Sequence, residues 1–228
     1  MTHEIRVGVD IGGTFTDVAL HHPGGLASCK VLTDYAHPEQ AILTGIQRAC
    51  DTAGVPLSAI AQVIHGTTLV TNALIQRRGA HLAFITTEGF RDVIEMRSEN
   101  RFEQYDLNLT LPDRFTVAER VAADGSVLLP LAQAEVDAMV EAIRSGGYQA
   151  VAIGFLHAYA NPAHEAQMAD ALRAALPDLA VSQSSVISPL MREFERFNTV
   201  IANAYVQPQV AAYLGRLVAR LRDQDVCA

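Results

Sequence analysis

The chain has 228 residues, of which 50% are hydrophobic and 18% are charged, and its formal net charge is −8. This much apolar sequence can bury enough surface to offset the entropy lost on ordering, which excludes an intrinsically disordered chain. The acidic pI of about 5.4 and the lack of a basic run argue against nucleic acid as the main partner. The length fits one large domain, or one domain and part of another.

Lysine and cysteine usage excludes further classes of site. Lys30 is the only lysine, and no Gly-Lys-Ser/Thr sequence follows a glycine loop, so a Walker-type ATP site is excluded. Cys29, Cys50 and Cys227 have no Cys-x-x-Cys spacing, which favours reduced thiols over disulfides or structural zinc. No window approaches the roughly 20 apolar residues of a membrane span, so we predict a cytoplasmic protein without a membrane partner.

The first quarter of the chain predicts two hairpins followed by a helix. Alternating apolar residues predict strands over residues 5–10, 15–21 and 26–32, separated by glycine-rich turns. Pro38 is a suitable first helical residue, and Gly54 lies just past the last apolar position at helical spacing.

The rest of the chain alternates strands with helices. We expect strands over 61–64, 81–86, 151–156 and 179–182, and helices over 67–78, 89–97, 136–143, 168–176 and from 194, the last kinking or restarting at Pro208. Asp124-Gly125 predicts a hairpin between strands 115–123 and 126–129, and residues 98–112 predict a long polar loop. The fold class is therefore α/β, with N-terminal β-hairpins leading into a βα-alternating mixed sheet.

The turn after the first predicted strand has the sequence Asp-Ile-Gly-Gly-Thr-Phe-Thr-Asp. Gly12 and Gly13 let backbone N–H groups approach a phosphate, and the Thr14 and Thr16 hydroxyls add hydrogen bonds. Asp10, at the end of the preceding strand, is a candidate catalytic residue and a candidate Mg²⁺ ligand, usually through water. An ordinary Gly-Gly hairpin is the alternative, but the flanking aspartate and the alternating threonines favour a phosphate site. The turn runs into a strand, so the dinucleotide fingerprint does not apply.

A second polar motif, His-Gly-Thr-Thr, stands at a predicted strand-to-helix junction. Gly66 permits close backbone approach, and Thr67 and Thr68 offer hydroxyls and free N–H groups where an anion is favoured. Simple N-capping accounts for one threonine but not for the cluster. Asn72, one turn further, is a candidate to orient the substrate. His65 is a candidate general base, although a histidine near a strand end is more often a structural hydrogen-bonding residue.

Two charged segments have weaker signals. Residues 91–97 carry mixed charges typical of a solvated helix face, and we keep Arg97 as a candidate for binding a substrate carboxylate. In residues 192–197, Phe194 and Phe197 are predicted to face the core. The charges around them would then point outward or toward a domain cleft.

The glycine-threonine turn resembles the first phosphate motif of the actin/heat-shock-chaperone/sugar-kinase ATPase superfold. Its Phe-Thr-Asp ending is similar to the hydantoinase A/5-oxoprolinase family in particular. Further matching segments are Lys-Val-Leu-Thr at 30–33, the His-Gly-Thr-Thr segment at 65–74, Ile-Thr-Thr-Glu-Gly-Phe-Arg-Asp-Val at 85–93, Arg-Glu-Phe-Glu-Arg-Phe at 192–197 and Asn-Ala-Tyr-Val at 203–206. These segments extend over nearly the whole chain.

The resemblance implies a ribonuclease H-like, actin-like ATPase lobe. It also implies ATP-dependent opening of a cyclic amide such as a hydantoin or 5-oxoproline, with ATP and Mg²⁺ as cofactors. The alternatives are a subunit of an ATP-dependent ketone carboxylase of the acetone carboxylase type, or a truncated module that is inactive alone.

The resemblance also implies a domain organisation and partners. Residues 1–185 would be the hydantoinase/oxoprolinase N-terminal domain and residues 186–228 the start of a hydantoinase A core domain. The second nucleotide-binding lobe, with the adenosine-binding residues, would follow residue 228. We expect an oligomer and a second large subunit of the hydantoinase B type.

Overall fold

The computed structural model describes residues 4–34, 37–96 and 113–226. The chain divides into two compact units, one made of Met1–Asn72 with Val210–Ala228 and the other of Ala73–Gln209. The C-terminal segment thus belongs to the same unit as the N-terminus. The expected boundary at residue 185 concerns family modules rather than compact units, and it stays a prediction.

The N-terminal unit contains a four-stranded mixed sheet in the order β3-β2-β1-β4. Its elements are β1 (Ile5–Ile11), β2 (Phe15–His22), β3 (Gly25–Leu32), α1 (Pro38–Ala53), the short helix η1 (Leu57–Ala59), β4 (Ile60–Thr67) and the C-terminal part of α7 (Glu193–Asp223). Strand β1 is antiparallel to β2, which is antiparallel to β3, whereas β4 runs parallel to β1.

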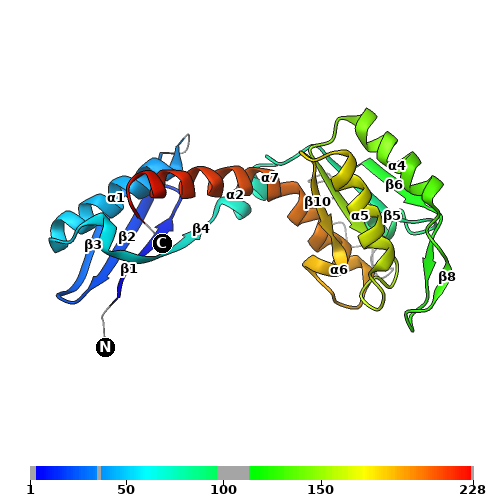
Figure 1. The fold of residues 1–228 in the computed structure, drawn as a ribbon, viewed down its shortest axis with the longest axis horizontal. Helices are drawn as coiled ribbons and strands as arrows, with labels where there is room; N and C mark the ends of the chain where they lie inside the picture. Colours follow the sequence, from blue (N-terminus) through cyan, green and yellow to red (C-terminus); the bar gives the residue numbers. More distant parts are fainter. Residues whose placement is uncertain (1–3, 35–36, 97–112, 227–228) are drawn as a thin grey trace. The chain divides into compact units, whose positions relative to one another are not determined.

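Only one face of this sheet contributes to the hydrophobic core. Val7, Val9 and Ile11 alternate along β1 and pack in one cluster with Ile46 of α1 and Leu217 of α7. Both helices lie over that same face in Figure 1. Because side chains alternate across a strand, the intervening residues of β1 face the other side.

The second unit is built on a four-stranded parallel sheet in the order β10-β9-β5-β6. Its elements are β5 (Leu82–Thr87), α3 (Val93–Met96), β6 (Asp113–Val117), β7 (Arg120–Val121), β8 (Val127–Leu129), α4 (Gln133–Gly146), β9 (Ala150–Gly154), α5 (Ala163–Ala175), β10 (Ala180–Gln183), α6 (Ser184–Ile187) and the first turns of α7. Helix α2 (Leu69–Ile75) spans the chain position at which the two units divide.

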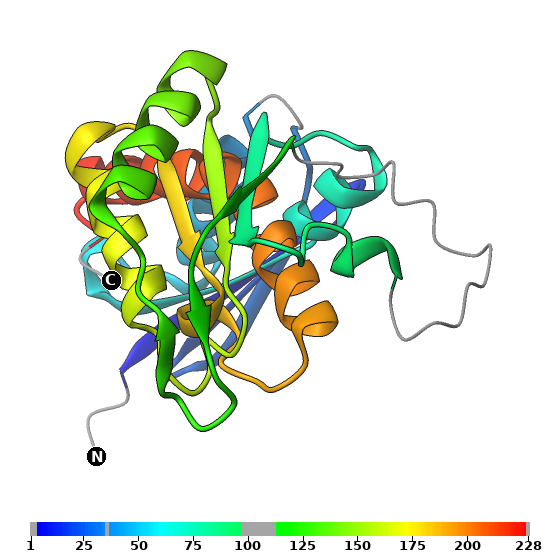
Figure 2. The same ribbon diagram turned by 90° about the vertical axis from the view of Figure 1, so that its right-hand side faces the viewer.

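Strands β5 and β9 are buried on both faces. Ala83 and Ile85 pack with residues of α4 and α5, which cover one face in Figure 2. Phe84 points the other way, with its ring 5.3 Å from that of Phe197 on α7. A Cβ on Gly154 would lie 2.6 Å from the Phe197 ring, so glycine permits this close helix packing. Both strands are therefore continuous apolar runs rather than alternating ones.

The structure confirms the α/β class and most of the expected elements. Both N-terminal hairpins are present, and α1 begins at Pro38 and ends before Gly54, whose φ of 66° is the left-handed cap geometry. The Asp124-Gly125 hairpin joins β7 to β8, with Gly125 at φ 85°. Within residues 4–34, 37–96 and 113–226, no helix is both long enough and apolar enough to cross a bilayer.

Several expected boundaries are wrong. The hairpins share a sheet with β4, while β5, β6, β9 and β10 form a separate sheet. The strand expected over 115–123 is divided, because β6 pairs with β5 while β7 pairs with β8. The helix expected over 67–78 is shorter, since β4 continues to Thr67, and the one expected over 89–97 is reduced to Val93–Met96. Of the two outcomes expected at Pro208, a restart is wrong, because α7 continues through the proline and loses only the hydrogen bond of one N–H. A kink at Pro208 stays a prediction.

Candidate phosphate site

The turn between β1 and β2 has a two-residue tip. The Gly12 N–H donates to the Phe15 carbonyl at 2.9 Å, which leaves Gly13 and Thr14 exposed at the tip. A Cβ on Gly12 would lie 3.0 Å from the Phe15 carbonyl oxygen, so a side chain there would push against the backbone of the turn. The tip therefore presents backbone with little side-chain cover, as phosphate binding requires.

Thr16 lies beneath the turn and not at its tip. Its side chain is fully buried, and its hydroxyl is 3.0 Å from that of Thr33. Since Thr33 donates its own proton to the Gly12 carbonyl at 3.1 Å, Thr16 is the donor to Thr33. The prediction that Thr16 contacts a phosphate directly does not fit this position. Strand alternation turns it into the core, where it supports the turn.

Replacing Thr16 by valine should lower the free energy of unfolding by about 1 kcal/mol, because one buried hydrogen bond is lost at nearly constant volume. Urea denaturation measures this change. Thr52→Val is the matched control, since the exposed Thr52 hydroxyl bonds only its own helix, at the Arg48 carbonyl. An equal effect of both substitutions would contradict a supporting role for Thr16.

The second motif meets the turn at the end of β1. The Thr68 hydroxyl donates to the Ile11 carbonyl at 3.5 Å and accepts a hydrogen bond from the Asn72 amide at 3.3 Å. The Thr67 hydroxyl accepts the Leu69 N–H at 3.1 Å. A small pocket at this place is lined by Gly12, Thr33, Thr67, Thr68, Asn72 and Tyr213, among others. The structure thus brings the two sequence motifs together.

Asp10 lies near the end of β1 on the open face of the sheet, one residue before Ile11, which lines the pocket. It is in register with Asp17 on β2 and Gly66 on β4. A Cβ on Gly66 would lie 3.3 Å from Asp10 Oδ1, so glycine leaves space next to the carboxylate. Lys30 pairs with Asp17 at 3.0 Å. These two residues, Asp10 and Gly66 all line a second hollow, on the open face of the sheet. The Asp10 carboxylate is accordingly open to a ligand.

A single carboxylate suits magnesium held together with water and phosphate oxygens. Among the described residues, no three His, Cys, Asp or Glu side chains lie close enough to form a metal cage. Mg²⁺ commonly binds through one or two carboxylates and keeps several waters. Asp10, with the space beside Gly66, fits that mode of binding.

His65 faces the opposite side of the sheet from Asp10. It pairs with Val9, one residue before Asp10, and so shares the helix-covered face. Its Nε2 is 2.7 Å from the Tyr213 hydroxyl. Burial lowers the pKa of His65, while a hydrogen bond with the Val9 backbone and the negative charge of Asp10 act to raise it. The two predicted catalytic residues are therefore not brought together, because alternation separates neighbouring pairs across the sheet.

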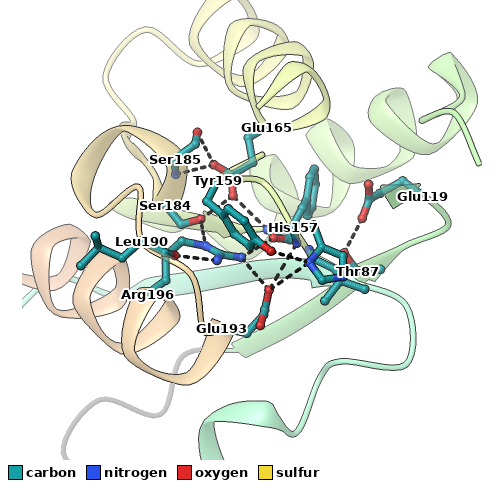
Figure 3. A network of polar contacts seen from close by, with 12 residues as sticks. Thr87, Glu119, His157, Tyr159, Glu165, Ser184, Ser185, Leu190, Glu193 and Arg196 are labelled. Carbon is teal, nitrogen blue, oxygen red and sulfur yellow. Dashed lines mark hydrogen bonds and ion pairs between the residues drawn. The ribbon is translucent and has the colours of Figure 1, made fainter. Parts of the chain in front are cut away.

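A second polar cluster lies at the carboxyl ends of the parallel strands in the other unit (Figure 3). Arg196 is fully buried there. Its Nε donates to Ser184 Oγ at 3.0 Å, Nη1 to the Leu190 carbonyl at 3.0 Å, and Nη2 to the Phe155 carbonyl at 2.8 Å and to Glu193 Oε1 at 3.3 Å. The expectation that the charges of this segment all point outward or into a cleft is wrong for Arg196.

Glu165 of α5 forms the other half of this cluster. It accepts hydrogen bonds from the Ser184 and Ser185 hydroxyls, both at 2.6 Å, and from the Phe155 N–H at 2.9 Å. Burial raises the pKa of Glu165, and these hydrogen bonds oppose the rise. The cluster joins the end of β9 to α5, α6 and α7, so its role is to hold this edge of the sheet.

A neighbouring set of buried hydrogen bonds holds the end of β5. The Thr87 hydroxyl donates to Glu119 and accepts the Leu156 N–H at 2.9 Å. Glu119 also bonds His164 Nδ1 at 2.7 Å. These side chains are buried, and each is satisfied by another part of the protein, which favours a structural role.

Comparison with known proteins decides the family. Residues 6–176 match the family described as hydantoinase/oxoprolinase N-terminal region. The chain belongs to this family. It is 33% identical to the caprolactamase subunit alpha of Pseudomonas jessenii over 230 residues, which cover 95% of this chain and 33% of that protein. The chain thus spans about a third of the length of this relative.

Solved structures of hydantoinase/oxoprolinase relatives share the fold. The ATP-dependent caprolactamase of Pseudomonas jessenii superimposes with a TM-score of 0.83 at 31% identity, over 96% of this chain and 34% of that one. A nucleotide-free acetone carboxylase gives a TM-score of 0.82 at 19% identity, over 97% and 35%, and indicates the fold alone. The chain therefore has the fold of an actin-like ATPase-type lobe.

Within this hydantoinase/oxoprolinase chain, the pocket contains some predicted residues and others that sequence reasoning missed. Gly12, Thr67, Thr68 and Asn72 line it, whereas Arg97 lies outside the described residues. Thr33 and Tyr213 were not predicted as part of the site. Thr33 belongs to a matching segment and could have been found there, but Tyr213 reaches the pocket from a distant helix and has no local signal.

Proposed function

We propose that this chain forms the phosphate-binding part of an ATP-dependent enzyme that opens cyclic amides. The observation that carries the proposal is the meeting of the glycine-threonine turn with Thr68 and Asn72 at one pocket, at the end of the strand that also carries the open Asp10 carboxylate. Similarity to an ATP-dependent caprolactamase supports a cyclic amide as substrate, because caprolactam is one.

The residues of the site have distinct roles in this proposal. Backbone N–H groups at Gly13 and Thr14 bind phosphate oxygens, and the Thr67 hydroxyl, which keeps its proton, extends the binding surface. The Thr68 hydroxyl donates to the Ile11 carbonyl and so holds the second motif against the turn. Asp10 holds hydrated Mg²⁺, which when bound would neutralise charge on the phosphates. Asn72 orients the bound group through its amide, one helical turn from Thr68.

The reaction activates a poor electrophile. The amide oxygen attacks the γ-phosphorus of ATP, and the bond from that phosphorus to the bridging oxygen breaks, releasing ADP. Water then adds to the activated carbon. The ring C–N bond breaks and the nitrogen takes up a proton, which opens the ring to an acyl phosphate. A second water adds to the same carbon and the bond to the phosphorylated oxygen breaks, so inorganic phosphate leaves with the former amide oxygen and an amino acid is released.

Several features of the whole protein belong to this proposal. The relative is named as a subunit, so we propose a second large subunit and an oligomer. Mg²⁺ and a cytoplasmic location remain predictions of the same kind. The remaining nucleotide contacts would be made outside this chain, and we expect the isolated chain to lack turnover.

The fold shared with acetone carboxylase keeps a second function open. In a ketone carboxylase the same phosphate site would activate a ketone oxygen, and a carboxylate would be the product. Bicarbonate-dependent ATP hydrolysis in the presence of a ketone would favour this alternative over amide opening.

A label-transfer experiment tests the main proposal. With the full-length protein and its partner subunit, a cyclic amide carrying heavy oxygen at its carbonyl should give ADP and labelled inorganic phosphate, because the amide oxygen leaves with the phosphoryl group. Mass spectrometry of the phosphate measures the label. Ring opening with unlabelled phosphate, or ring opening without ATP consumption, would contradict the proposal.

A further inference from the structure

Tyr213 is the lining residue that comes from the helix farthest along the chain. It lies on α7, is 2% exposed, and packs in the core of the N-terminal unit with Leu217 and Leu221 of the same helix. It also lines the pocket together with Gly12 and Thr68. A tyrosine placed between a core and a polar pocket commonly keeps its hydroxyl hydrogen-bonded.

The partner of that hydroxyl is His65. The distance from the Tyr213 hydroxyl oxygen to His65 Nε2 is 2.7 Å, and the rings are 5.6 Å apart at 49°. Burial raises the pKa of Tyr213 to about 12, while burial lowers that of His65. Near neutral pH both groups are therefore uncharged and joined by a neutral hydrogen bond. His65 does not line the pocket and reaches it through Tyr213.

Ion pairs between α1 and α7 stabilise the same part of α7. Glu39, in the first turn of α1, is fully buried, and its Oε1 is 3.5 Å from Arg216 Nε and 4.0 Å from an Arg220 nitrogen. Pro38, next to Glu39, lines the pocket. Helix α7 therefore contacts α1 through the Glu39 ion pairs and β4 through the Tyr213–His65 hydrogen bond, both next to residues that line the pocket.

We infer that Tyr213 is a positioning residue of the candidate phosphate site and that His65 contributes by holding the Tyr213 hydroxyl, not by moving a proton to or from the substrate. This inference rests on the proposed function. The hydroxyl joins α7 to β4, which carries Gly66 and Thr67 and leads directly into Thr68, and so sets the width of the pocket. Losing this bond should weaken phosphate binding in the ground state and the transition state alike.

Four variants of the full-length protein test the inference. Tyr213→Phe and His65→Ala each remove the hydrogen bond and should raise the KM for ATP about tenfold, with kcat changed less than about threefold. The double variant should be no worse than either single one, since both remove the same interaction. His65→Gln should stay within about threefold of wild type, with an unchanged pH profile of kcat, because the glutamine amide can bond the hydroxyl but cannot titrate.

Other outcomes overturn the inference. A loss of kcat of about 100-fold or more in His65→Gln, with loss of one limb of the pH profile, would make His65 a catalytic residue. Additive effects in the double variant would make the two residues independent. A wild-type protein without ATP turnover would contradict the proposed function instead. The pair is then tested by nitrogen NMR of His65, whose ring shifts must change in Tyr213→Phe. If His65→Ala fails to fold, the NMR spectra of Tyr213→Phe and the kinetics of His65→Gln test the inference in its place.

Discussion

Replacing Asp10 by alanine is expected to abolish ATP turnover by the full-length protein, with a decrease in kcat of about 100-fold or more. The carboxylate is exposed on the open face, next to the space left by Gly66, and it is the proposed protein ligand of hydrated Mg²⁺. The neighbouring Asp17 carboxylate is already paired with Lys30, so it does not replace Asp10 as a ligand of the cation. Preorganised charge of this kind typically contributes that much to the rate.

The controls for Asp10 separate its chemistry from its fold. Asp10→Asn keeps the shape and removes the charge, so it should lose turnover as well. Asp51→Ala removes an exposed carboxylate of α1 that bonds only Gln47, and should leave turnover unchanged. Since Asp10 is exposed, thermal unfolding should hardly change in either Asp10 variant. Turnover close to wild type in Asp10→Ala would contradict the phosphate site.

Replacing Arg196 by alanine is expected to lower the free energy of unfolding by about 3–5 kcal/mol. Removing one member of a buried charged network leaves its partners unsatisfied, and this cost exceeds the net value of the interaction itself. The Phe155 carbonyl, Ser184 and Glu193 would each lose one hydrogen bond inside the second unit (Figure 3).

Denaturation monitored by circular dichroism measures the effect of the Arg196 substitution. Arg144→Ala is the matched control, because Arg144 is about half exposed and pairs with Glu141 on the surface of α4. A surface pair of this type contributes about 1 kcal/mol or less. Arg196→Lys should fall between the two, since lysine keeps the charge but loses the planar donors. A change below about 1 kcal/mol in Arg196→Ala would contradict a structural role.

Local sequence patterns were sufficient for the class and for much of the candidate site. Alternation in β1 and β2, and the Pro38 and Gly54 ends of α1, depend on interactions within a few residues, and the structure confirms them. The family motifs are equally local. Their joint presence predicts a phosphate site.

Local patterns failed where an element depends on a distant partner. The segment over 115–123 has the composition of one strand, but β6 and β7 pair with different neighbours. Pro208 is unfavourable in isolation, yet α7 continues through it. Arg196 belongs to a charged segment typical of a solvated surface, and only its partners at the end of β9 and in α6 account for its burial.

The sequence by itself determined the α/β class, the two N-terminal hairpins, the glycine-threonine turn and the family. Tertiary structure alone decided which face each residue takes. A period of two places Asp10 and His65 on opposite sides of the sheet, but only the packing of α1 and α7 over one side shows which of them is open to a ligand. Tyr213 reaches His65 across a sequence separation of 148 residues. Such a contact arises from the packing of whole elements, and no local pattern encodes it.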